Sequence, residues 1–228
     1  MVALNLIMVG SMLTSASVGQ YPATNSSPQY RVEFEDDQVR VLRVSLRGGE
    51  ATPVEAHPDA VLIYLTADLD GRVPDAAATW QPMGTYGLQN HARTSFEALL
   101  VELIAPASGA PASVEPEAMP VAYSYSSWST ESPFYEPDAH QASTLVENAR
   151  VAVTWHRLVP LVQTEPYHFH LRDTLLVYLR GGEMSGSTGQ LGFHRARRGE
   201  FHVLPPNVLH AHGNVGNDPI EFVMIAPK

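Results

Sequence analysis

The sequence predicts an all-β protein built from two tandem copies of one domain. Short apolar runs alternate with Gly, Pro, Asn and Asp, which is typical of strands joined by turns. A pattern found in the first half of the chain returns in the second half. His168 and His170 lie one residue apart in an extended run, so both imidazoles point to one face of a strand and their Cα atoms are expected about 6.6 Å apart.

The composition narrows the classes of function. The 228 residues include 24 acidic and 14 basic side chains, for a formal net charge of −10, and no basic stripe occurs. This balance argues against nucleic acid and anionic membranes as partners. Because the chain has no cysteine, disulfides and thiolate catalysis are excluded.

Residues 1–19 resemble a secretory signal peptide. Residues 2–13 are apolar and uncharged, and small residues follow, with cleavage expected near Ala16 or Gly19. The mature protein is then expected to be periplasmic or secreted, without stable membrane insertion after cleavage. The alternative is a buried N-terminal strand, which leaves the protein cytoplasmic.

The first copy of the repeat is expected at residues 30–104, after a polar lead-in over residues 20–29. Its expected strands are 31–35, 39–46, 60–65 and 96–104, separated by turn residues. Within the second strand, Arg40 and Arg43 are expected near the surface.

Residues 105–143 have the Pro, Ser and Ala composition of a linker. The second part of this segment is too aromatic for a free linker, since it contains Tyr123, Tyr125, Trp128, Phe134 and Tyr135. We expect it to pack against a neighbouring domain or a subunit partner, which leaves a homodimer open.

The second copy is expected at residues 144–228. Residues 147–153 repeat residues 35–41 at an offset of 112, and Asn214 follows Asn90 at an offset of 124. Ordered matches with a growing offset indicate a duplicated domain in which the second copy carries insertions.

Two separated motifs in the second copy resemble the signature motifs of cupins. The first is His168-x-His170, and the second places Gly199, Pro205, His210 and Asn214 at the cupin spacing. Asn207 stands where glycine is usual, and asparagine also tolerates a positive φ. The resemblance covers both halves. It implies a bicupin, with two tandem double-stranded β-helix barrels of jelly-roll type and a metal inside the barrel.

The cupin resemblance implies a metal site formed by His168, His170 and His210. Neutral imidazoles suit a divalent transition metal such as Fe, Mn, Ni or Zn, and three of them leave coordination positions open. The carboxylate ligand of many cupins is absent, because Thr174 and Leu175 occupy its usual places. Asp173 is one residue early and should face the other side of the strand.

Several neighbouring residues carry open alternatives. His212 is either a fourth ligand or supporting residue of the metal site, or a surface residue. Thr174 is either a packing residue or a hydrogen-bond partner of bound water. We expect three further histidines to be ordinary surface or strand residues: His156, His194 and His202.

The first copy has different residues at the corresponding positions. Glu55 stands for His168, His57 for His170, and Tyr86 for His210. This barrel is expected to be structural or to bind a small ligand without metal. The alternative is a pocket in which Glu55 and Tyr86 act as an acid–base pair.

Two functions are therefore compatible with the sequence. The first is a metal-dependent dioxygenase or other oxidoreductase acting on a small organic molecule through the three-histidine centre. The second is a non-catalytic bicupin that binds a small molecule such as a sugar or an organic acid.

Overall fold

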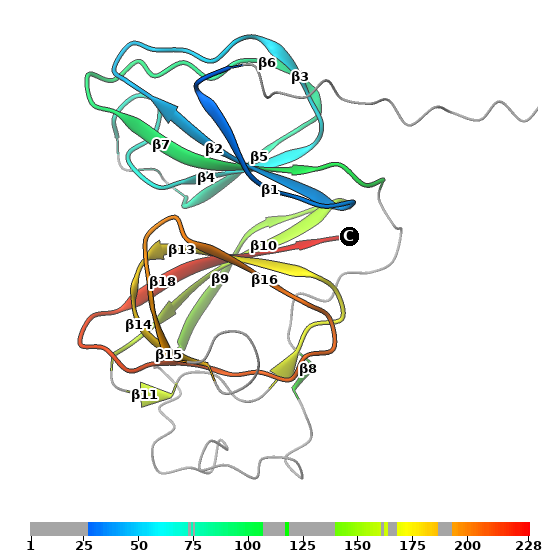
Figure 1. Ribbon diagram of the computed structural model, residues 1–228, viewed down its shortest axis with the longest axis vertical. Helices are drawn as coiled ribbons and strands as arrows, with labels where there is room; N and C mark the ends of the chain where they lie inside the picture. The colour runs from blue at the N-terminus through cyan, green and yellow to red at the C-terminus, as the bar shows by residue number, and fades with distance from the viewer. Residues whose placement is uncertain are drawn as a thin grey trace, which may run out of the picture.

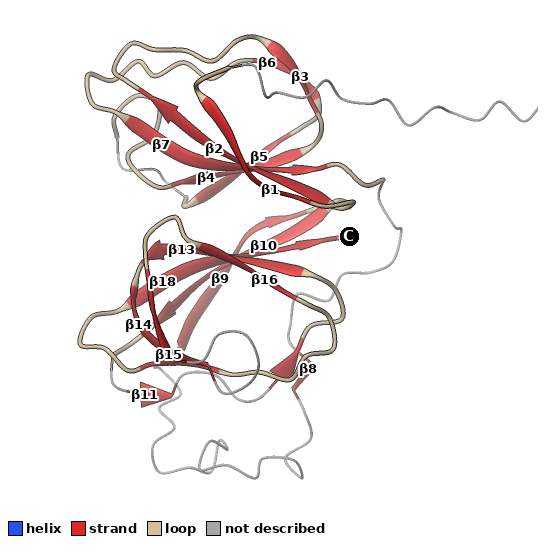
Figure 2. Cartoon of the chain, viewed as in Figure 1, coloured by secondary structure: helices blue, strands red, loops and turns tan. Residues whose placement is uncertain are grey.

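The computed structural model shows an all-β protein, as the sequence predicts (Figure 2). It describes residues 27–106 except 73 and 75, then 117–118, 140–160, 162–163, 168–186 and 193–228. The expected signal peptide (1–19), most of the lead-in (20–29) and most of the expected linker (105–143) lie outside these residues. Within the described ranges there is no helix, and hence none able to cross a membrane.

The N-terminal half, residues 27–106, contains one five-stranded antiparallel sheet and one two-stranded ribbon (Figure 1). The order in the sheet is β1-β2-β7-β4-β5. These strands are β1 (Tyr30–Glu35), β2 (Val39–Leu46), β4 (Ala60–Tyr64), β5 (Ala78–Gln81) and β7 (Phe96–Leu103). The ribbon pairs β3 (Glu55–His57) with β6 (Gly84–Tyr86).

The C-terminal half, the described residues from 140 to 228, contains two larger sheets (Figure 1). The first has the order β9-β10-β18-β13-β16: β9 (His140–Glu147), β10 (Val151–Leu158), β18 (Ile220–Pro227), β13 (Thr174–Arg180) and β16 (Phe201–Leu204). The second has the order β11-β17-β14-β15: β11 (Val162–Gln163), β17 (His212–Asn214), β14 (Gly182–Gly186) and β15 (Phe193–Ala196). In addition, β8 (Glu117–Ala118) pairs with β12 (His168–Phe169).

The two five-stranded sheets repeat one order of strands, with β9, β10, β18 and β13 in the places of β1, β2, β7 and β4. Asn90 and Asn214 also have the same role. Each side-chain nitrogen donates to the backbone carbonyl four residues later, at 2.8 Å. Each side-chain oxygen accepts from the N–H two residues later, at 3.1 and 3.0 Å.

One boundary differs from the expectation. Strand β9 begins at His140, before position 144, because the backbone at His140 pairs with Leu158 of β10. The polar composition of residues 140–144 masked this strand, and pairing with a long apolar neighbour decided it.

The core consists of three apolar clusters, because successive side chains of a strand point to opposite faces. One cluster fills the N-terminal half and includes Leu42 and Leu100, while another fills the C-terminal half and includes Leu176 and Phe222. The third, which we call the shared cluster, joins the facing sheets of the two halves (Figure 1). Its buried members include Val41, Val101, Ile63, Val153, Val177, Val223 and Ile225.

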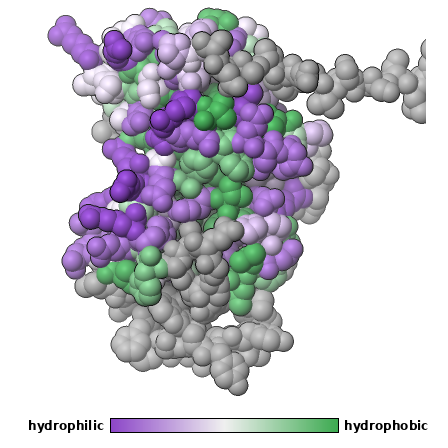
Figure 3. Space-filling model, viewed as in Figure 1, coloured by the Kyte–Doolittle hydropathy of each residue, from purple (hydrophilic) through white to green (hydrophobic). Residues whose placement is uncertain are grey.

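Polar contacts border the shared cluster. Arg43 Nη2 donates to the carbonyl of Gly199 at 2.6 Å, and Arg150 Nε donates to Asp59 Oδ2 at 3.0 Å. Hydrophilic side chains line the hollow between the halves at the left of the view in Figure 3. The two halves are therefore joined by an apolar contact with a polar border.

Candidate functional site

The backbone brings the two histidine motifs of the C-terminal half together directly. The N–H of His168 donates to the carbonyl of His210 at 2.9 Å, and the N–H of His210 donates to the carbonyl of His168 at 2.8 Å. This reciprocal pair is the hydrogen-bonded pair of an antiparallel ladder. The N–H of Asn207 also donates to the carbonyl of His170, at 2.7 Å. These main-chain hydrogen bonds thus fix the backbone of all three histidines relative to one another.

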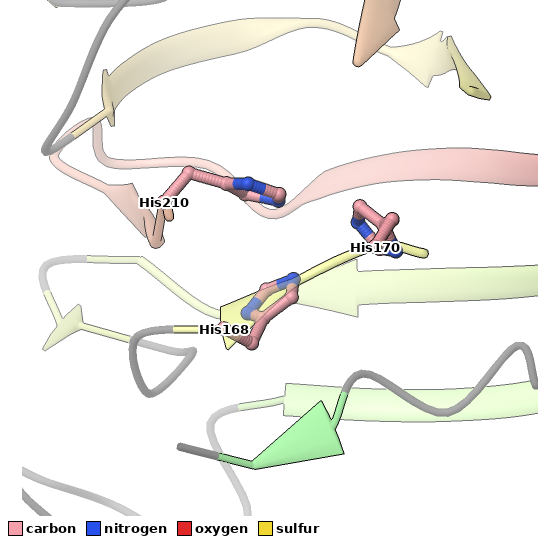
Figure 4. A group of neighbouring side chains, drawn as sticks. All are labelled: His168, His170 and His210. Atoms are coloured by element: carbon pink, nitrogen blue, oxygen red, sulfur yellow. The ribbon is translucent and has the colours of Figure 1, made fainter. Parts of the chain in front are cut away.

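The side chains of His168, His170 and His210 converge (Figure 4). Their ring centroids are 4.4 Å apart for His168 and His210, 4.9 Å for His170 and His210, and 5.1 Å for His168 and His170. One nitrogen of each ring lies within 4.8 Å of the others. All three residues are buried, with exposures of 3%, 7% and 5%. Buried imidazoles this close together form a set of donors suited to one metal ion.

One hydrogen bond orients His210 for such a role. Its Nδ1 lies 2.8 Å from the carbonyl oxygen of Val208, and a carbonyl can only accept, so Nδ1 carries the proton. In the neutral ring, the lone pair is then on Nε2. Metal-binding histidines commonly show this arrangement, in which the second ring nitrogen donates to a backbone carbonyl. The residues present therefore fit a divalent transition metal.

The structure distinguishes among the neighbouring residues. His212 is 1% exposed on β17, so it is not a surface residue, and its ring centroid is 5.1 Å from that of His210. It lies beside the three-histidine group without being a member of it. The hydroxyl of Thr174 donates to the carbonyl of Arg172 at 3.2 Å, which turns it toward its own backbone.

Asp173 lies outside the three-histidine group. It lines a small hollow between the two halves together with Asp36. Burial raises the pKa of the Asp173 carboxyl, and the negative charges of Asp36 and Asp37 raise it further. No carboxylate therefore takes the place of the missing glutamate among the described residues around this group.

Asn207, which stands where the cupin motif usually has glycine, has a left-handed backbone conformation with φ of 60°. We expect Asn207→Gly to change the free energy of unfolding by less than about 1 kcal/mol, because glycine adopts this φ without strain. Asn207→Val should lower it by about 1–2 kcal/mol, because a side chain branched at Cβ is strained there. Urea unfolding of both variants measures the difference. Equal stability of the two would show that the turn tolerates an ordinary φ.

The ribbon of the N-terminal half brings together Glu55, His57 and Tyr86. Glu55 pairs directly with Tyr86 across β3 and β6, and His57 lies two residues along β3 on the same face. The His57 ring stacks on Tyr86, with centroids 4.5 Å apart and an interplanar angle of 24°. The three positions aligned with the histidines of the C-terminal half thus share one site.

A buried network behind His57 was missed by the sequence analysis. Glu102 Oε1 lies 2.8 Å from His57 Nδ1, and Glu102 Oε2 accepts from Arg40 Nε at 2.7 Å. His57 and Glu102 are 0% exposed and Arg40 is 5% exposed. The expectation that Arg40 lies near the surface was wrong, because Arg40 shares the inward face of β2 with Leu42. Its even spacing from Leu42 was the available signal.

Polar atoms face the interior of this half. Within the described part of the chain, Glu55 Oε1, His57 Nε2 and Tyr86 Oη are buried without a hydrogen-bond partner. Burial raises the pKa of the Tyr86 hydroxyl, and the charge of Glu102 raises it further. Burial also raises the pKa of Tyr30 to about 12. Both hydroxyls therefore remain protonated at neutral pH and can donate to a bound ligand.

His194 and His202 are half-buried residues of strands β15 and β16, within the expectation, but the group that they form was not expected. Both lie with Glu200 in a second compact group in the C-terminal half. Burial lowers the pKa of His202, and the neighbouring His194 lowers it further. Local spacing did not indicate this group, because His194 of β15 and His202 of β16 lie in two different sheets. His156 is also buried, at 9% exposure, and stacks on Phe222.

Comparison with known proteins places the fold among cupins. No family profile and no curated protein sequence matches the chain. Solved structures do, including a cupin 2 conserved barrel domain protein from Leptotrichia buccalis (15% identity, TM-score 0.53, covering 87% of this chain and 88% of that one). The putative glyoxylate-induced protein of Pseudomonas aeruginosa matches at 13% identity and a TM-score of 0.55, covering 87% and 79%. Salicylate 1,2-dioxygenase of Pseudoaminobacter salicylatoxidans, solved with gentisate, matches at 10% identity and a TM-score of 0.54. The match covers 83% of this chain and 68% of that one. At these identities the likeness establishes the cupin fold.

Proposed function

We propose that the chain is a bicupin whose C-terminal barrel binds one divalent transition metal and oxidises a small organic molecule with dioxygen. The observation that carries the proposal is the convergence of His168, His170 and His210, all buried, with ligand nitrogens within 4.8 Å of one another. Fe, Mn, Ni and Zn all suit such nitrogen donors, and an oxidation with dioxygen favours Fe or Mn among them.

The chain's own residues position the reaction. Reciprocal main-chain hydrogen bonds fix His168 against His210, and the carbonyl of Val208 fixes the ring of His210. Three protein ligands leave coordination positions for other molecules. When bound, the metal supplies Lewis acidity and a place at which substrate and dioxygen meet.

The likeness to salicylate 1,2-dioxygenase supports this reaction class through the fold alone. It makes hydroxylated aromatic acids the first substrates to test. Such a substrate could place oxygen atoms at the open coordination positions, because carboxylate and phenolate oxygens are good metal ligands.

The second candidate is a bicupin that binds a small molecule, such as a sugar or an organic acid, without catalysis. The specific observation favouring it lies in the N-terminal half. There the buried atoms Glu55 Oε1, His57 Nε2 and Tyr86 Oη offer acceptor and donor groups to a polar ligand. Among the described residues, no carboxylate joins the three histidines, which also agrees with a binding role.

Metal analysis and oxygen uptake test the proposal together. When both proteins are purified without chelator, the variant His168→Ala/His210→Ala should contain about one metal ion per chain less than the wild type, because it lacks two of the three ligands of one site. His91→Ala, which changes an exposed histidine of the N-terminal half, is the matched control and should keep its metal. Undiminished metal content in the double variant would contradict the site.

An oxygen electrode then separates the two functions. The iron- or manganese-loaded protein should consume dioxygen with at least one hydroxylated aromatic acid, and the double variant should not. A ligand that raises the melting temperature without oxygen uptake, in both proteins alike, would instead support the binding module.

A further inference from the structure

The C-terminal half contains a second group of metal-ligand residues, formed by His194, Glu200 and His202. One ligand atom from each of these residues lies within 4.8 Å of the others. We propose that this group is a second site for a divalent first-row transition metal, separate from the three-histidine centre. Its own donors are two imidazoles and one carboxylate.

The strand registers direct both histidines into the same half of the molecule. His202 of β16 pairs with Leu176 of β13, and His194 of β15 pairs with Met184 of β14. Residues directly opposite in an antiparallel pair share a face. Since Leu176 and Met184 belong to the cluster that fills the C-terminal half, both histidines point inward, from the two facing sheets.

Glu200 is held in place by the backbone. Its Oε2 accepts from the N–H of Arg197 at 2.9 Å, which fixes the carboxylate beside β16. The other oxygen, Oε1, lies 3.3 Å from Nε2 of His202. Within the described residues this nitrogen is buried and makes no hydrogen bond of good geometry, even with that oxygen. A ring nitrogen and a carboxylate oxygen at this separation can also serve as two ligands of one cation.

The ring of His194 completes the group. Its centroid is 5.3 Å from that of His202, with an interplanar angle of 78°. The hydroxyl of Tyr178, a residue that is 0% exposed, lies 3.4 Å from Nε2 of His194. A partner of this kind on a ring orients the imidazole and so supports metal binding.

The donor set determines the class of ion. Two nitrogen ligands and one oxygen ligand favour Zn, Ni, Co or Cu over Mg and Ca, which prefer oxygen. The single carboxylate charge offsets part of the charge of a divalent ion. Three protein ligands also leave room for water or a small anion.

Exposure separates this site from the three-histidine centre. The side chains of His202 and Glu200 are 28% and 34% exposed, whereas His168, His170 and His210 are 3–7% exposed as residues. A metal bound by the outer group should therefore be reached by a chelator before a metal bound by the inner group. The two sites can then be distinguished by the rate at which a chelator removes their metal, as well as by the number of ions bound per chain.

Zinc stoichiometry of the full chain tests the proposal. The apoprotein loaded with Zn²⁺ and freed of excess metal should retain about two ions per chain, and the metal should leave to a chelator in two phases. His194→Ala/His202→Ala should retain one ion and lose the fast phase. His168→Ala/His210→Ala should retain one ion and lose the slow phase, so failure of either site is seen separately.

Glu200→Gln tests the group with less disturbance to the fold. Because the amide keeps the shape but loses the charge, zinc at the outer site should bind about tenfold or more weakly. Circular dichroism verifies the fold of each variant, and His91→Ala serves as the matched histidine control. The proposal is overturned if His194→Ala/His202→Ala, correctly folded, keeps both the stoichiometry and the fast phase of the wild type. It is also overturned if the wild type binds one ion and His168→Ala/His210→Ala binds none.

Discussion

Glu102→Ala is expected to lower the free energy of unfolding by about 3–5 kcal/mol, because it leaves Arg40 as a buried charge without a partner. Glu102 is 0% exposed and accepts from Arg40 Nε at 2.7 Å, while its other oxygen holds His57 Nδ1 at 2.8 Å. Removing the carboxylate therefore affects two buried side chains at once. Urea unfolding followed by circular dichroism measures the loss.

A matched control lies on the same strand. Glu97 of β7 has a side chain that is 45% exposed, and its oxygen is 3.5 Å from Arg43 Nη1. Glu97→Ala should cost less than about 1 kcal/mol, because an exposed ion pair is screened by water. The double variant Arg40→Met/Glu102→Leu should recover part of the loss, since the buried charge is then absent. Similar losses for Glu97→Ala and Glu102→Ala would refute the buried network.

Ile225→Ala is expected to lower the free energy of unfolding by about 2–5 kcal/mol, the range for deleting a large buried aliphatic side chain. Ile225 of β18 is 0% exposed and belongs to the shared cluster between the halves. It pairs with Val153 on one side and Leu175 on the other, both members of the same cluster. The cavity that Ile225→Ala leaves should therefore weaken both the contact with the N-terminal half and the sheet to which β18 belongs.

Met224→Ala is the control for this coupling, because Met224 is the preceding residue on β18 and faces the interior of the C-terminal half. Native-state hydrogen exchange can follow the amides of β2 and β7 in the N-terminal half. These amides should exchange faster in Ile225→Ala, and change less in Met224→Ala. If neither variant altered their exchange, the two halves would be energetically independent.

Much of the fold could be predicted from local patterns. The expected strands at 39–46, 60–65 and 96–104 correspond to β2, β4 and β7, which end at Leu46, Tyr64 and Leu103. The continuous apolar run at 60–65 is typical of a buried strand. Strand β4 is buried on both faces, because Ala60 and Leu62 pack inside the N-terminal half and Val61 and Ile63 enter the shared cluster. What covers each face depends on the packing of segments far apart in the chain, so no local pattern shows it.

The candidate sites also contain some features that were predicted from the sequence and others that were not. The resemblance of two short motifs to those of cupins predicted that His168, His170 and His210 form one group. The burial of Arg40 was not predicted, since it depends on Glu102, the partner across the sheet. The group of His194, Glu200 and His202 was also missed, because those side chains meet only when two sheets face each other.

By itself, the sequence determined the strand class, the duplicated pattern, the left-handed position at Asn207 and the identity of three converging histidines. The strand class and the repeat follow from periodicity and spacing, which act over a few residues at a time, whereas the assignments of Asn207 and the three histidines follow from the resemblance to the cupin motifs. Only the tertiary structure decided that Arg40 and Glu102 are buried together, that the halves share an apolar cluster, and that a second ligand group exists. The buried ion pair and the shared cluster depend on contacts between distant segments, where burial changes the energetic cost of a charge. The second ligand group depends on two sheets that face each other and so bring His194 close to Glu200 and His202.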